Sequence, residues 1–94
     1  MVASAQEIKS QLLSSINQQF IDVVGPIGNL LIDDAKATWQ RKQWHGRAAI
    51  RHYITFLAEQ IDDVSQRQKF AKDMSQLLYE AQKQADRLKE SKRG

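Results

Sequence analysis

The sequence predicts an all-α protein, a small four-helix bundle that ends in a long, partly solvated C-terminal helix. Three observations support this fold class. Apolar residues recur in four segments at three- and four-residue steps, the spacing of one helix face, and not at the two-residue step of a strand. One proline and four glycines are too few for the tight turns of an all-β fold. A length of 94 residues suffices for one small domain with a single modest core.

The first predicted helix begins near Ser4, which forms a capping-box pattern with Glu7. Its apolar stripe recurs at every fourth residue, at Ile8, Leu12, Ile16, Phe20 and Val24. Gly25 and Pro26 end this helix, because the residue before a proline avoids helical geometry whereas proline itself fits the first turn of a new helix. Gly28 permits close approach of a neighbouring helix. We therefore predict a sharp structural junction formed by Gly25, Pro26 and Gly28.

The second helix is expected to start at Pro26, to fade before Gly46 and to turn Asp33 and Asp34 outwards. Its predicted apolar side consists of Ile27, Leu30, Leu31, Ala35 and Trp39. The third helix, at about residues 47–61, has the widest apolar face, made of Ala49, Ile50, Tyr53, Ile54, Phe56, Leu57 and Ile61. Because these residues span an arc of about 160°, we expect this helix to pack against more than one neighbour.

Asp62 and Asp63 are expected to cap a fourth helix, because carboxylates accept hydrogen bonds from the free amides at a helix N-terminus. The apolar stripe of that helix continues through Phe70, Met74, Leu77, Ala81 and Leu88, with Leu78 and Ala85 beside it. We place the domain core at about residues 4–82 and a polar helical tail at residues 83–94. Two interpretations of the tail stay open: a solvated, fraying helix end, or a short coiled-coil arm in which Gln84 sets the register.

The net charge of +3 conceals a basic centre. Residues 35–58 contain five basic residues and no acidic residue, and two tryptophans bracket the densest part. Trp39 is expected in the core, whereas Trp44 is either a lid on the bundle or an exposed contact residue. Two partners fit this segment equally well in charge: an acidic protein, or a nucleic acid bound by a helix-turn-helix-like layout whose connection is longer than standard. The candidate partner-binding residues are Arg41, Lys42, Trp44, Arg47 and Arg51.

The residue types argue against catalysis. With no cysteine, the chain has no disulfide, thiolate metal site or cysteine nucleophile. The spacing of His45 and His52 matches no metal signature, and adjacent carboxylates such as Asp33 and Asp34 point about 100° apart on a helix. We therefore expect a protein that is not an enzyme and binds no metal or cofactor. We also expect no signal peptide, no membrane-spanning helix and a cytoplasmic location.

The segment from Phe20 to Ala35, with Gly25-Pro26-Ile27-Gly28 at its centre, resembles a small helical module attached to bacterial and cyanobacterial signalling proteins such as Ser/Thr kinases and response regulators. The likeness extends loosely over residues 12–78. It implies a regulatory or docking role and transfers no catalytic residue. Together with the wide apolar faces and the long last helix, it leads us to expect a non-enzymatic protein–protein interaction module that self-associates as a homo-oligomer.

Overall fold

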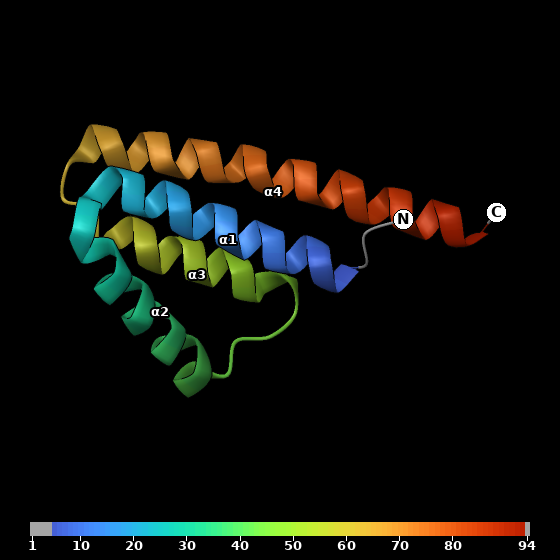
Figure 1. Cartoon of the computed structure of the whole chain (residues 1–94), viewed down its shortest axis with the longest axis horizontal. Coiled ribbons are helices and arrows are strands. Elements are labelled where there is room, and N and C mark those ends of the chain that lie inside the picture. The colour runs from blue at the N-terminus through green and yellow to red at the C-terminus, as the bar shows by residue number, and fades with distance from the viewer. Residues whose placement is uncertain (1–4, 94) are drawn as a thin grey trace.

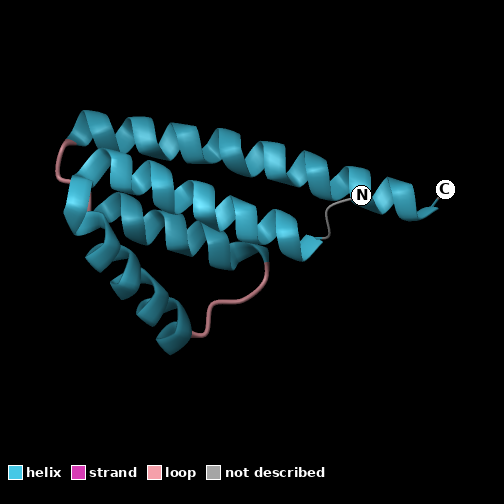
Figure 2. Cartoon of the chain, viewed as in Figure 1, coloured by secondary structure: helices cyan, strands magenta, loops and turns pink. Residues whose placement is uncertain are grey.

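The computed structural model describes residues 5–93 of the chain, and the side chains of residues 7–46 and 48–87. The described part consists of four α-helices and one short 3-10 turn, without a strand: α1 (Ala5–Val24), η1 (Gly25–Ile27), α2 (Gly28–Lys42), α3 (Arg47–Glu59) and α4 (Val64–Arg93) (Figures 1 and 2). The predicted all-α, four-helix fold is confirmed. The predicted cap Ser4 lies outside the described residues.

Three of the helices lie side by side and the fourth diverges from them. In Figure 1, α1 and α4 run in opposite directions along the length of the molecule, α3 lies beside them, and α2 leaves the corner at η1 at a wide angle. Helix α3 contacts both α2 and α4, which confirms the expectation from its wide apolar face. Helix α4 is about 45 Å long and α1 about 30 Å, from their lengths of 30 and 20 residues. The last turns of α4 therefore project beyond α1 (Figure 1).

The core joins α1, α3 and α4 through side chains that are almost completely enclosed. Phe20 of α1 and Phe70 of α4 meet edge to face, with ring centroids 5.9 Å apart. This is a favourable geometry for two aromatic rings. The largest fully buried side chains are Ile16, Phe20, Tyr53, Leu57, Ile61, Phe70 and Met74. All seven lie on the apolar stripes that the sequence predicts.

The Gly25–Gly28 junction is as sharp as predicted, and its two glycines are needed for different reasons. Gly25 has a φ of 80°, in the region that disfavours residues with a side chain. At Gly28 the backbone of α2 approaches α1 closely: a Cβ atom there would lie 2.8 Å from Cγ1 of Ile21. The junction thus turns the chain at Gly25 and seats the start of α2 directly on the end of α1.

The predicted apolar side of α2 is partly wrong. The residues of α2 that are buried are Gly28, Ile32, Ala35 and Thr38, whereas Ile27 and Leu30 are 54% and 65% exposed. The close seating of Gly28 on α1 explains the difference. It directs the row at positions 28, 32 and 35 into the bundle, and this rotation carries Leu30 to the outside. The α-helix also begins at Gly28 and not at Pro26, because residues 25–27 form the 3-10 turn.

This rotation predicts unequal effects for two neighbouring aliphatic residues. Ile32→Ala is expected to lower the free energy of unfolding by about 2–4 kcal/mol. Ile32 is only 5% exposed, so truncating its side chain leaves a cavity in the core. Leu30→Ala is expected to change it by less than about 0.5 kcal/mol, as is typical of exposed sites. Urea unfolding followed by circular dichroism measures both. A larger loss of stability for Leu30→Ala than for Ile32→Ala would show that Leu30 faces the core, as predicted from the sequence.

The ends of α2, α3 and α4 are defined by backbone geometry and capping. Gln43, with a φ of 56°, ends α2, and Gly46, with a φ of 71°, leads into α3. Helix α3 ends at Glu59, two residues earlier than predicted. The carboxylate of Asp63 accepts a 2.8 Å hydrogen bond from the backbone amide of Gln66, which confirms the predicted cap of α4. Among the described residues, no helix combines the length and apolarity needed to cross a bilayer.

Candidate functional site

A groove of about 480 Å³ runs between α3 and α4 on the outside of the bundle. Its walls are mainly apolar carbon, and polar and charged side chains stand along its edges. The apolar lining consists of Ile54, Ala58, Ala71, Met74 and Leu78. The edges carry Arg51, Thr55, Glu59, Arg67, Gln68 and Ser75.

The groove exists because small side chains occupy the flanks of both helices. On α4, positions 67, 71, 75 and 78 follow one another at helical spacing beside the buried stripe. Ala71 and Ser75 are the exposed members of this row, and Ala58 lines the opposite wall on α3. Larger residues at these positions would close the space between the helices. The buried Met74 forms part of the floor instead.

Three charged residues border the groove, and their environments differ. Nε of Arg67 donates a 2.9 Å hydrogen bond to the backbone carbonyl of Ile61, which holds this side chain against the α3–α4 connection. Arg51 and Glu59 are exposed on α3, and neither makes an ion pair or hydrogen bond with any residue that the structure describes. They lie eight residues apart, or about 12 Å along the helix axis. The groove thus offers one cation and one anion without partners.

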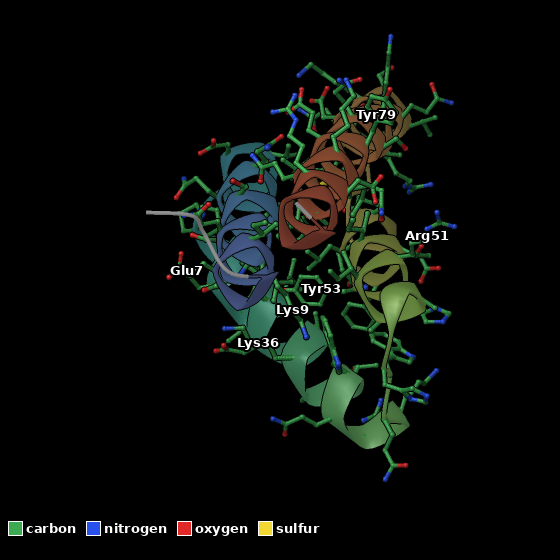
Figure 3. All side chains as sticks on the ribbon, turned by 90° about the vertical axis from the view of Figure 1, so that its right-hand side faces the viewer. Glu7, Lys9, Lys36, Arg51, Tyr53 and Tyr79 are labelled. Atoms are coloured by element: carbon green, nitrogen blue, oxygen red, sulfur yellow. The ribbon has the colours of Figure 1, made fainter. Side chains whose placement is uncertain are left out.

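The residues predicted to bind a partner are spread over the end of α2, the α2–α3 connection and the start of α3. Arg41 and Lys42 are exposed in the last turn of α2. Arg47 is the first residue of α3, but its side chain lies outside the described part of the structure. Figure 3 shows the side chain of Arg51 on the opposite side of the molecule from Lys36, another cation of the basic segment. Arg51 lines the groove, whereas Arg41, Lys42 and Trp44 do not.

Trp44 closes one end of the bundle. Nε1 of Trp39 donates a 2.9 Å hydrogen bond to the backbone carbonyl of Trp44. The Trp44 ring stacks on the His52 ring, with centroids 5.3 Å apart, and its centroid lies 6.3 Å from that of the Trp39 ring. Both tryptophans pack against the core. Of the two interpretations left open by the sequence, these contacts support the lid. Trp39 itself is half-buried, and its ring centroid lies 5.4 Å from that of Tyr53.

Tyr53 is the most strongly perturbed ionisable group of the described chain. Its side chain is 1% exposed, and its hydroxyl donates a short hydrogen bond to Oδ1 of Asn17 on α1. Burial raises the pKa of Tyr53 to about 12, and the negative charge of Asp33 acts in the same direction. This pair joins α3 to α1 inside the bundle and faces no groove, so we assign it a structural role.

The other polar residues considered for chemistry are exposed on a helix, cap a helix or contact a ring or a backbone carbonyl. Asp33 and Asp34 are exposed on α2, and Asp63 caps α4. Nδ1 of His45 lies 3.1 Å from the carbonyl of Gln43, and His52 stacks on Trp44. Within residues 7–46 and 48–87, no cluster of three histidine or acidic side chains is arranged to hold a metal ion.

These observations define a small four-helix domain with a mainly apolar groove between α3 and α4. The chain belongs to the family described as a domain of unknown function, DUF8082, whose model matches residues 11–84. This range includes every residue that lines the groove. Neither a curated protein nor a solved structure matches the chain. The resemblance of the Phe20–Ala35 segment to modules of signalling proteins stays a prediction.

Proposed function

We propose that this domain is a non-enzymatic protein-interaction module that associates with a second copy of itself. The observation that carries the proposal is the α3–α4 groove, where an apolar lining meets exposed charges that have no partner within the described chain. Removing apolar surface from water favours association, and complementary charges at the edge select the partner and its orientation.

A regulatory role, and not catalysis, fits the distribution of polar residues. The histidines and carboxylates that chemistry would require serve as helix caps, helix-surface residues or ring contacts. The resemblance of the Phe20–Ala35 segment to signalling-protein modules supports a place in bacterial signalling in the cytoplasm. In that setting, self-association would assemble complexes and not transform a substrate.

Nucleic-acid binding through the basic segment is the alternative. It has weaker geometric support, because Arg51 and Lys36 point to opposite sides of the molecule and Trp44 is held against Trp39 and His52. Base stacking would require an accessible aromatic face. Arg41 and Lys42 remain accessible for phosphate contacts at the end of α2.

Sedimentation equilibrium of the full chain, from micromolar to sub-millimolar concentration, tests the proposal. We expect the weight-average mass to rise with concentration toward that of a dimer. A constant monomer mass throughout this range would contradict self-association. A parallel sample with a mixed DNA and RNA pool at low salt tests the alternative, because binding through phosphates is tight at low salt and weakens steeply as salt is added.

A further inference from the structure

We infer that two copies join groove to groove, about a two-fold axis between their Thr55 side chains, so that Arg51 of each copy pairs with the partner's Glu59. This inference rests on the proposed self-association and adds the surface and the orientation. In a two-fold interface, residue i contacts residue j of the partner, and residue j contacts residue i in return. A surface suited to this symmetry must therefore carry complementary groups at equal distances from its centre.

The outer row of α3 meets this requirement. Arg51, Thr55 and Glu59 follow one another at four-residue steps, so they form one ridge along the helix. All three are exposed and line the groove. Thr55 is small and lies midway between the two charges. When two such ridges pack antiparallel, each arginine meets a carboxylate, whereas a parallel arrangement would bring like charges together.

The wall formed by α4 is compatible with this arrangement because the exposed residues that line it are uncharged. Gln68, Ala71 and Ser75 would face the second copy without bringing like charges together. Arg67, the remaining charged residue of the groove, is tied to the carbonyl of Ile61 at one end. Small residues at the edge also allow the backbones of two α3–α4 pairs to approach closely, so that four helices surround the joined grooves.

The projecting end of α4 fits the groove less well than a second α3–α4 pair does. Residues 82–93 contain five basic and two acidic residues. Inserting this segment would place a basic helix beside the guanidinium groups of Arg51 and Arg67. Like charges at such short distances disfavour association. Charge therefore favours pairing of groove with groove.

Charge reversal on α3 tests the orientation. Arg51→Glu and Glu59→Arg are each expected to raise the dimer dissociation constant at least about tenfold, because each variant places two like-charged pairs in the interface. The double variant exchanges the charges and is expected to return to within about threefold of the parent. Lys36→Glu changes the net charge as much as Arg51→Glu does, but at an exposed residue outside the groove that makes no ion pair with the described residues, and serves as the matched control.

Disulfide trapping tests the position of the two-fold axis. Because the chain has no cysteine of its own, an introduced cysteine can form a disulfide only with its copy in the partner. The Thr55→Cys variant is expected to form a covalent dimer under mild oxidation, whereas Ser14→Cys, exposed on α1, is not. If the protein dimerises but the double charge variant stays weak and Thr55→Cys does not cross-link, this interface is wrong while self-association stands. If the parent is monomeric at every concentration, the proposed function itself fails.

Discussion

Replacing Phe20 with alanine is expected to lower the free energy of unfolding by about 3–5 kcal/mol, the usual range for a buried phenylalanine. The Phe20 side chain has no exposed surface, and its ring packs edge to face on Phe70. It therefore holds α1 against α4, the two longest helices. A domain of this size is stabilised by roughly 5–14 kcal/mol, so this one substitution would remove a large fraction of its stability.

Tyr79→Ala is the matched control for Phe20→Ala, because it also truncates an aromatic residue of the helical bundle. Tyr79 is 58% exposed on α4, and the ammonium group of Lys83 lies over its ring, 5.0 Å from the centroid. We expect this variant to lose less than about 1 kcal/mol. Urea unfolding measures both variants, and a loss of similar size for the two would show that Phe20 does not anchor the core.

Raising the pH from about 10 to 12 is expected to destabilise the protein by roughly 2 kcal/mol through Tyr53 alone. The ordinary pKa of a tyrosine is 10.0, and burial raises that of Tyr53 to about 12. Above pH 10 the unfolded chain therefore loses this proton while the folded chain retains it. The stabilising effect of the raised pKa is complete below pH 10 and is lost as the pH rises through 12.

The Tyr53→Phe variant isolates this effect from the titration of lysines over the same range. It is expected to lose about 1–2 kcal/mol at neutral pH, because Oδ1 of Asn17 loses its donor. Above pH 10 its stability should then fall less steeply than that of the parent. Tyr79→Phe removes an exposed hydroxyl and is expected to leave the steep fall in place. Equal slopes for Tyr53→Phe and the parent would exclude Tyr53 as the source.

The fold follows from the sequence wherever local spacing determines burial. The stripes of α1, α3 and α4 repeat at the period of the helix, and their members Phe20, Leu57 and Phe70 are buried as predicted. The buried side of α2 was not predictable in the same way. Its rotation depends on the contact of Gly28 with Ile21, which belongs to tertiary packing. Because Leu30, Leu31 and Ile32 are consecutive, apolar spacing alone fits more than one face of α2.

Most of the groove could not be predicted from the sequence. Of its lining, only Arg51 was a predicted partner residue, because it belongs to the basic segment. Ala58, Ala71 and Ser75 carry no conspicuous signal, since small neutral residues are common on any helix surface. They become meaningful only when α3 lies beside α4. The available signal was the row at positions 67, 71, 75 and 78 beside the core stripe, in which only the first residue, Arg67, is charged.

The most direct test of this account is the dilution of the unmodified protein, followed through its backbone amide resonances. We expect concentration-dependent shifts at the residues of α3 and α4 that line the groove, centred on Thr55 and Ser75. The outer face of α1 should remain unchanged. Shifts confined to the projecting end of α4 or to the basic end of α2, with none at the groove, would contradict the assignment of the α3–α4 groove as the interaction surface.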